Sequence, residues 1–369
     1  MRILLTADTY GGVGSFAREL ALGLAERGHA IVLASLGEPT DTTWIGDRAI
    51  SFHRSPLRLE WMSAGAEDLA ASRRWLEGLI AAFAPDLLHA NQFAFACFAA
   101  TLPVVLTVHS DVVSWWRAVH GAAPPSPWRE WYGELAAGAL AAASTVVVPS
   151  AAAAADLRAS FGFAGPIALI ANGLTPLPPT SPPRRQDITA LAAGRLWDAG
   201  KQIQLLLRPD LPLPVRIAGP SQPPIGAGAS AAAFPALPQI TLLGELSRRA
   251  LAAEFGRASV FIGPSRYEPF GLAALEAASA GCALLLNDIP SYREIWGAAA
   301  AYFRRDDGDS LVRQLQALAA DDPRRRRLAS AARHRARRLY SRRRMTAHYL
   351  RLYSSLTARA TRVRAAAAA

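Results

Sequence analysis

Two carboxylates flank a turn in the second half of the chain. The segment SRYEPFGLAALEAASAGCALL places Glu268 and Glu276 eight positions apart, with a proline, a glycine and small apolar residues between them. The preceding run, ASVFIGPS, is typical of a buried strand, and LAALEAASAG of a helix. The backbone N–H groups near Phe270, Gly271 and Leu272 would then be unpaired first-turn donors. This pattern suits a polyhydroxylated ligand that carries phosphate. The alternative is that Glu268 caps the helix and Glu276 is solvated.

Two cations follow another expected strand. In AAGRLWDAGKQIQLLL, Arg195 comes just after the apolar run and Lys201 enters the next expected helix six residues later. Arginine can bind phosphate oxygens through two parallel hydrogen bonds, and lysine adds a point charge. The pair therefore predicts an anion site, with two solvated cations as the alternative.

Two further strand ends could face a ligand. The loop GGVGS, Gly11 to Ser15, follows the first strand and opens a helix, which favours an anion. It is not a full G-x-G-x-x-G, and no acidic residue ends the second strand, so nicotinamide binding is disfavoured. A tight turn without a ligand is the alternative. His109 ends PVVLTVHS, where a structural and a catalytic role are both open.

An aromatic cluster follows His109. Trp115 and Trp116 are its first members, and Trp128, Trp131 and Tyr132 complete it within eighteen residues. Prolines interrupt the cluster, so it is not one helix. One interpretation is that the rings pack in the core; the other is that they form an acceptor platform on which sugar rings or an apolar carrier lie.

The elements that must position these residues alternate along the chain. Near-continuous apolar strands separated by helices predict parallel sheets covered on both faces. Residues 1–178 form a first Rossmann-like domain in this interpretation, and 188–335 a second. The proline-rich stretch 173–187 links them, and residues 336–369 form an arginine-rich helical tail that packs back toward the first domain. Ligands in such sheets bind beyond the carboxyl ends of the strands, here in the cleft between the domains.

Composition narrows the class of protein. The 369 residues are 51% hydrophobic and carry a net charge of +11. Neither a signal peptide nor a membrane span is predicted, so we expect a cytoplasmic protein. Twelve arginines and no acidic residue lie between Arg324 and Arg351. A solvated face and attraction to an anionic membrane or an acidic substrate are the alternatives, and no motif supports nucleic-acid binding. The cysteines Cys97 and Cys282 offer no metal cluster.

These motifs resemble a known family. RYEPFGLAALEA is similar to the E-x7-E motif of retaining glycosyltransferases of family 4 (glycosyl transferases group 1), which have the GT-B fold of two Rossmann-like domains. GGVGSFARELALGLAERGHAIVL, TVHS, VVVPS, IANG and GRLWDAGK follow in that family's order, over roughly residues 1–350. The resemblance implies that the second domain binds a nucleotide-diphospho-sugar.

The resemblance also implies roles for single residues. Arg195 and Lys201 would neutralise the diphosphate, Glu276 would hold the ribose, and Glu268 would contact the donor sugar. The backbone at Phe270, Gly271 and Leu272 would touch sugar and phosphate, His109 would lie near the sugar, and the Gly11–Gly12 loop would close over the reaction centre. Gln202 departs from the glycine or asparagine common after the lysine.

The chemistry implied by the resemblance is transfer with retention, by front-face attack, because no carboxylate nucleophile is evident. The acceptor would be a glycan, a lipid carrier or a small molecule, and no cofactor or metal would be needed. Asp307-Gly308-Asp309 looks like a metal-binding D-x-D but lies far in sequence from the other motifs. The alternatives are a sugar-nucleotide epimerase or phosphorylase on the same scaffold, and a non-catalytic nucleotide-sugar-binding protein.

Overall fold

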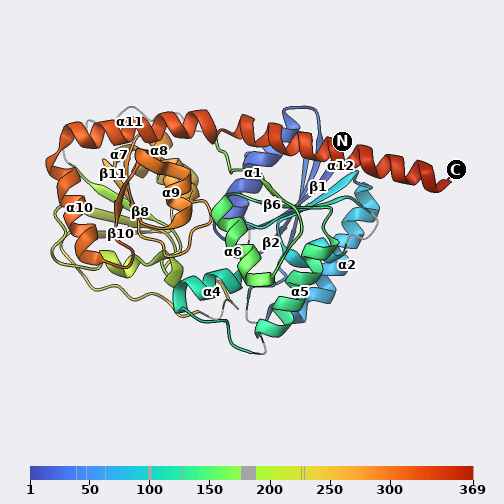
Figure 1. Cartoon of the computed structure of the whole chain (residues 1–369), viewed down its shortest axis with the longest axis horizontal. Helices are drawn as coiled ribbons and strands as arrows, with labels where there is room; N and C mark the ends of the chain where they lie inside the picture. Colours follow the sequence, from blue (N-terminus) through green and yellow to red (C-terminus); the bar gives the residue numbers. More distant parts are fainter. Residues whose placement is uncertain are drawn as a thin grey trace.

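The computed structural model describes residues 1–369 except 39, 47, 63, 99–101, 127, 176–187, 226, 228 and 369. Two parallel sheets, each flanked by helices, lie next to each other along the long axis of the molecule (Figure 1). This arrangement confirms the predicted pair of doubly wound α/β domains. Of the proline-rich stretch 173–187, only residues 173–175 are described.

The sheet of the first domain has the order β3-β2-β1-β4-β5-β6-β7 within the described residues. Its strands are β1 (Arg2–Asp8), β2 (Ala30–Leu36), β3 (Ile50–Ser55), β4 (Leu87–Ala90), β5 (Val104–Thr107), β6 (Thr145–Val148) and β7 (Ile167–Leu169). The helices are α1 (Gly12–Ala25), α2 (Gly65–Phe83), α3 (Phe93–Phe98), α4 (Val112–His120), α5 (Trp128–Ala142) and α6 (Ala151–Phe161). The central strands are buried on both faces, which accounts for their continuous apolar runs.

The sheet of the second domain has the order β10-β9-β8-β11-β12-β13 in the described part of the chain. Its strands are β8 (Ala190–Ala193), β9 (Val215–Ala218), β10 (Ile240–Gly244), β11 (Val260–Gly263), β12 (Ala283–Asn287) and β13 (Ala301–Phe303). The helices are α7 (Arg248–Arg257), α8 (Leu272–Ala280), α9 (Pro290–Trp296) and α10 (Gly308–Ala320), with 3-10 turns η1 (Ala199–Lys201), η2 (Ile203–Leu206) and η3 (Gly297–Ala299). Lys201 therefore ends a 3-10 turn, and the α-helix expected after it is absent from this described stretch.

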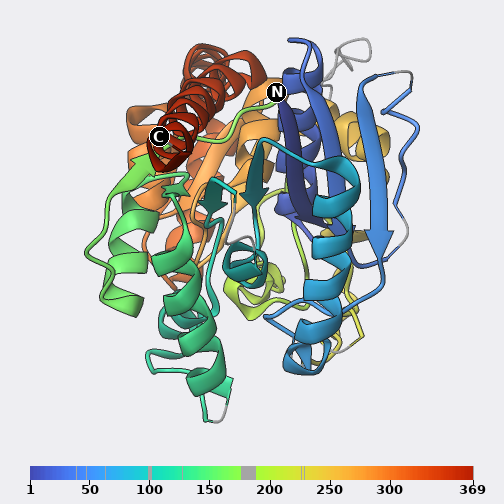
Figure 2. The ribbon, with the colours of Figure 1, turned by 90° about the vertical axis from the view of Figure 1, so that its right-hand side faces the viewer.

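Two long helices at the end of the chain connect the domains. Helix α11 (Asp322–Leu339) packs on the second domain against α8 and β12, and α12 (Arg342–Ala368) packs against α1 of the first domain. Figure 1 shows them running across the top of both domains, and Figure 2 shows α12 near the N-terminal strands. Met345, Tyr349 and Tyr353 are buried in the core of the first domain. The last helix is thus part of the first domain's core.

The chain crosses between the domains twice, at adjacent points. Leu174 N–H donates to the Tyr340 carbonyl and Arg342 N–H donates to the Leu174 carbonyl, both at 3.1 Å. A Cβ added to Gly173 would lie 2.4 Å from the Ser341 oxygen, so only glycine allows this approach. The two crossings therefore form one paired hinge segment, residues 173–175 with 340–342.

The alanine-rich segment Leu135 to Ala155 contains the end of α5, strand β6 and the start of α6. None of the described helices is long and apolar enough to cross a membrane.

Candidate active site between the two sheets

The carboxyl ends of the strands of both sheets bring the predicted residues together. Lys201 Nζ lies 2.5 Å from Glu268 Oε2, and the Gly271 N–H donates to Glu268 Oε1 at 3.0 Å. Ser291 Oγ donates to the Glu268 carbonyl at 2.5 Å. Glu268 thus lies between the lysine and the start of α8, which fixes its carboxylate. The expectation that the Gly271 N–H is unpaired was wrong, because Glu268 occupies it.

Arg195 reaches the same place from the end of β8. Its Nη2 lies 2.6 Å from Asp198 Oδ2, and Asp198 also accepts hydrogen bonds from the Gly200 N–H and from Trp115 Nε1. Burial opposes ionisation of Asp198, but Arg195 and Lys201 outweigh it, so its pKa is lowered. The buried carboxylate therefore orients the arginine.

The glycine loop of the first domain closes against this cluster. Gly11 has φ 78°, and a Cβ added there would lie 3.1 Å from Arg195 Nη1. A Cβ added to Gly12 would lie 3.1 Å from Leu272 Cδ1. The backbone of this loop therefore approaches the second domain closely. A Cβ at either glycine would require the facing side chain to shift, and at Gly11 the positive φ adds backbone strain.

His109 lies beyond the end of β5 with its ring packed on Phe16, 4.4 Å between ring centroids. The Asn91 amide nitrogen donates to the Thr6 carbonyl at 2.6 Å, so its oxygen faces His109 Nε2, 2.8 Å away. Nε2 must therefore carry the proton, which leaves Nδ1 as an acceptor. Burial lowers the pKa of His109 to about 3, so the ring is neutral at neutral pH.

Two buried carboxyl groups of the first domain, Asp8 and Glu60, were not predicted as site residues from the sequence. Asp8 ends β1, accepts from the Tyr10 N–H at 2.9 Å, and has its pKa raised to about 6 by burial. Glu60 accepts from the Phe93 N–H at 2.8 Å, and burial raises its pKa to about 7. An acidic residue at the end of the first apolar strand was the available signal for Asp8. Glu60, within RLEW, carries no such signal.

Glu276 faces the first domain across a small cavity between α1, α7 and α8. Ser15, Phe16 and Glu19 line it from α1, and Leu272 and Arg248 line it from the second domain. Burial raises the pKa of the Glu276 carboxyl to about 7, while Arg248 opposes and Glu19 adds to that rise. The structure therefore places this carboxyl between the domains, and a solvated Glu276 is excluded.

The first two aromatic residues after His109 have different partners: Trp115 bonds to the second domain, and Trp116 packs within the first. Trp115 Nε1 donates to Asp198 Oδ1 at 2.9 Å, across the cleft. Trp116 packs against Trp115 and His120 on α4, with a centroid separation of 4.5 Å from His120. The Phe270 ring, by contrast, is buried in the core of the second domain, 5.4 Å from the Tyr340 ring.

Asp307 and Asp309 have other partners. Asp307 accepts from the Ser310 N–H and so caps α10, and Asp309 pairs with Arg208 at 2.7 Å. In the part of the chain that the structure describes, no group of three or more histidine, cysteine or acidic side chains is arranged to hold a metal ion.

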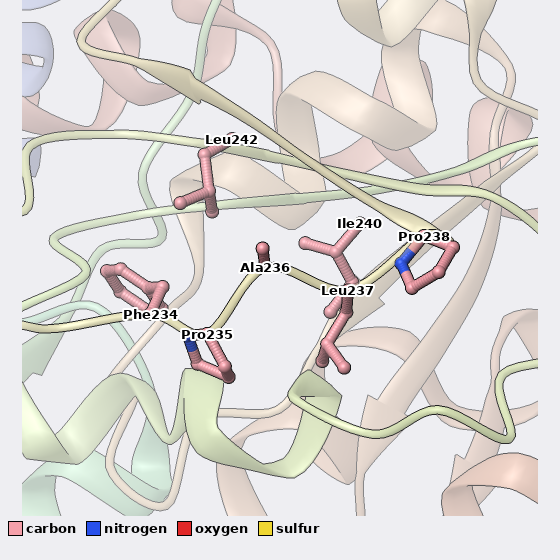
Figure 3. A pocket seen from close by; sticks show the side chains of 7 residues that line it. All are labelled: Phe234, Pro235, Ala236, Leu237, Pro238, Ile240 and Leu242. Carbon is pink, nitrogen blue, oxygen red and sulfur yellow. The ribbon is translucent and has the colours of Figure 1, made fainter.

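A second hollow lies along β10. Figure 3 shows it lined by Phe234, Pro235, Ala236, Leu237, Pro238, Ile240 and Leu242. None of these side chains is charged or polar, and the hollow is formed by other elements than those carrying the strand-end cluster. It therefore has no group that could act on a phosphate or a sugar.

Comparison with known proteins agrees with this arrangement. The family model "Glycosyltransferase Family 4" matches residues 10–176, and "Glycosyl transferases group 1" matches residues 203–335. A glycogen synthase of Mycobacterium tuberculosis is 26% identical over 91% of this chain and 90% of that protein.

Solved structures show the same fold. A sucrose-phosphate synthase from Thermosynechococcus elongatus aligns with a TM-score of 0.78 at 20% identity, over 97% of this chain and 99% of the other. Anabaena Alr3699/HepE, solved with UDP and glucose, aligns with a TM-score of 0.70 at 17% identity, over 96% and 100%. Both chains are matched over nearly their whole length, so the similarity includes both domains and the way they are joined.

Proposed function

The chain belongs to the group 1 glycosyltransferases, and we propose that it moves a sugar from a nucleotide-diphospho-sugar to an acceptor hydroxyl, with retention of configuration and without a metal ion. The observation that carries this proposal is the strand-end cluster of Arg195, Lys201 and Glu268, against which the Gly11–Gly12 loop closes. Such a cluster combines cations for a diphosphate with carboxylates for hydroxyl groups.

The side chains support distinct roles toward the donor. Arg195 and Lys201 would bind the diphosphate, and their charges would stabilise it as it leaves. Glu268, oriented by Lys201 and the Gly271 N–H, would accept from hydroxyl groups of the donor sugar. Glu276 would accept from the ribose hydroxyls. Neutral His109 would present Nδ1 as an acceptor near the sugar.

The reaction would proceed on one face of the sugar. The bond between the anomeric carbon and the phosphate oxygen breaks, the acceptor oxygen bonds to that carbon, and the departing phosphate takes the acceptor's proton. Lys201 and the Gly271 N–H already hold the Glu268 carboxylate. This suits a group that accepts hydrogen bonds from sugar hydroxyls better than a nucleophile. Retention then follows from attack on the face that the diphosphate leaves.

Donor turnover tests the proposal. UDP-glucose is the first donor to try, because HepE, which has the same fold, is solved with UDP-glucose, and ADP-glucose and GDP-mannose complete the set. We expect release of nucleoside diphosphate, slow in water and faster with a glycan or lipid-linked acceptor. Excess EDTA should leave the rate unchanged. A rate abolished by EDTA and restored by added metal would contradict metal independence.

The same assay separates the alternatives. An epimerase would alter the sugar without releasing nucleoside diphosphate, a phosphorylase would need inorganic phosphate, and a binding protein would take up the nucleotide-sugar without turnover. The fixed geometry of Arg195, Lys201 and Glu268 favours transfer over binding alone.

The arginine-rich helices favour peripheral association with an anionic membrane. Exposed arginines follow one another along α11 and α12, namely Arg326, Arg327, Arg337, Arg338, Arg343, Arg344, Arg351, Arg359 and Arg362. Such a face is attracted to anionic lipid over roughly a Debye length. We expect sedimentation with anionic liposomes at low salt and release at high salt. Absence of binding at low salt would contradict this association.

A further inference from the structure

The buried carboxylate of Glu19 on α1 contacts three separate segments of the chain. Its Oε1 lies 2.9 Å from Arg248 Nη2, at the start of α7 in the second domain. Its Oε2 accepts from the Thr175 N–H at 2.9 Å and lies 3.9 Å from Arg342 Nε. The Glu19 side chain is only 6% exposed. One carboxylate of the first domain thus contacts the second domain and both parts of the hinge segment, residues 173–175 and residues 340–342.

These contacts depend on how the two domains are oriented. Thr175 and Arg342 belong to the hinge segment, whereas Arg248 moves with the second domain. Opening the cleft would draw Arg248 away from α1 and leave a buried carboxylate without its main partner. Removing one partner of a buried ion pair is strongly unfavourable, so the Glu19–Arg248 pair favours the closed arrangement.

The pair also borders the predicted ribose site. Arg248 and Glu19 line the same cavity as Glu276, and Ser15 and Phe16 line it one turn earlier on α1. A nucleotide bound to Glu276 would therefore meet α1 only when the cleft is closed. The apparent affinity for a ligand falls in proportion to the population of the state that can bind it.

We propose that Glu19 is a positioning residue that couples cleft closure to nucleotide binding, by clamping Arg248 and the hinge segment against α1. Glu19 does not touch the reacting atoms in this inference. It acts through Arg248 and through the orientation of the domains. The inference rests on the proposed function, because it takes the cavity at Glu276 to be part of a nucleotide site.

The test compares isosteric variants by titration calorimetry. UDP, ADP and GDP are titrated into the wild-type protein, and the tightest of the three is used with Glu19→Gln, Arg248→Gln and the double variant. Glutamine keeps an oxygen for the Thr175 N–H but removes the charge that binds Arg248. We expect each single variant to weaken binding about tenfold, which corresponds to about 1.4 kcal/mol. We expect the double variant to be no weaker than the single ones, because both remove the same clamp.

Two readouts separate positioning from general stability. The rate of donor hydrolysis at saturating UDP-glucose should stay near the wild-type value, because closure by the bound donor restores the site, while the KM for UDP-glucose rises about tenfold. Glu26→Gln is the matched control. Glu26 follows α1 and pairs with Arg342 at 2.9 Å, but it is 48% exposed and makes no contact with Arg248. The Kd of the Glu26→Gln variant for the chosen nucleotide should stay within about twofold of wild type.

Each outcome decides a different statement. If Glu19→Gln does not fold, Arg248→Gln, which changes a partly exposed residue, carries the test alone. If the folded variants bind nucleotide as tightly as wild type, the inference is overturned while the proposed function stands. Additive losses in the double variant would also overturn it. If the wild-type protein binds none of the three nucleotides, the proposed function fails and the inference fails with it.

Discussion

The charged residues of the candidate site are held in pairs before any ligand arrives. Lys201 is bound to Glu268 and Arg195 to Asp198, each within 2.6 Å. A diphosphate would compete with both carboxylates for the cations, and the donor sugar would compete with Lys201 for Glu268. Cations oriented in advance need little rearrangement when charge develops, which is the condition for strong electrostatic catalysis.

Removal of either cation should therefore lower turnover more than binding. We expect Arg195→Ala and Lys201→Ala each to reduce kcat by about 100-fold or more, because each removes a stabiliser of the leaving diphosphate. Steady-state measurement of nucleoside diphosphate release checks this. Arg208→Ala is the control, since Arg208 pairs with Asp210 and Asp309. Wild-type rates in both site variants would place the diphosphate elsewhere.

The affinity for the donor should depend on pH through Glu276. Its raised pKa, about 7, means that the carboxyl is mostly protonated at pH 6 and mostly ionised at pH 8. In the proposed role the ionised form would accept hydrogen bonds from the ribose hydroxyl groups, so affinity should rise with pH, by at most about tenfold between these values. UDP-glucose is the suitable probe, because its diphosphate does not titrate in this range. In Glu276→Gln the profile should be flat and the affinity low at both pH values.

The residues found from sequence were those whose type and place within a motif carried a signal. Arg195 and Glu268 lie in the turns that follow β8 and β11. Lys201 ends the 3-10 turn η1, and Glu276 lies within α8. Glu19 and Asp198 were not found, because an acidic residue on an amphipathic helix or in a polar turn has no local mark of a partner in the other domain. Their partners are 229 and 83 positions away.

At the scale of elements, the apolar strands were predictable and the partly polar or very short ones were not. β1, β2, β6 and β12 are continuous apolar runs because helices cover both faces of the sheet. β3 reads ISFHRS and lies at the edge of the first sheet, where Ser51, His53 and Arg54 are exposed. β13 has only three residues and forms the edge of the second sheet. The polar residues of β3 and the short length of β13 removed the apolar signal.

Helix α4 makes several hydrogen bonds to the second domain, and the one donated by the Trp115 side chain can be tested separately. Trp115→Phe keeps an aromatic ring but removes the N–H that donates to Asp198. A typical hydrogen bond contributes about 1 kcal/mol, so we expect turnover to fall about fivefold through a less well oriented Arg195. The loss should be much smaller than in Arg195→Ala.

Trp116→Phe is the comparison for that variant, because its ring packs on α4 and His120 within the first domain. If Trp116 forms an acceptor platform, this variant raises the acceptor KM and leaves donor binding unchanged. If Trp115→Phe lowers the melting temperature while kcat and donor KM stay at wild type, the hydrogen bond serves packing alone.

For the whole molecule, α12 supplies buried side chains to the core of the first domain. The Tyr353 hydroxyl bonds to His89 Nδ1, and His89 Nε2 lies 2.7 Å from Thr107 Oγ1. Tyr349 bonds to the same threonine at 3.1 Å. This buried network joins α12 to β4 and β5, and Thr107 lies two positions before His109.

Loss of one hydroxyl in that network should destabilise the protein without altering the site. Tyr353→Phe leaves His89 with an unpaired buried nitrogen, which costs about 1–3 kcal/mol. Urea denaturation should show the loss, with donor KM unchanged in the folded protein. Arg351→Gln, exposed on the same helix, should unfold like wild type. Equal stability of Tyr353→Phe would mean that the histidine finds another partner.

The return of α12 also bears on the order in which the chain acquires its structure during synthesis. The first domain begins at residue 1, yet Met345, Tyr349 and Tyr353 belong to its core. A nascent chain therefore carries an unfilled groove along α1 until residues 345–353 have been translated. The second domain, with β8 to α11, has all its own strands and helices earlier. The domain that is made first is thus completed last, and translation that stops after residue 340 leaves its core open.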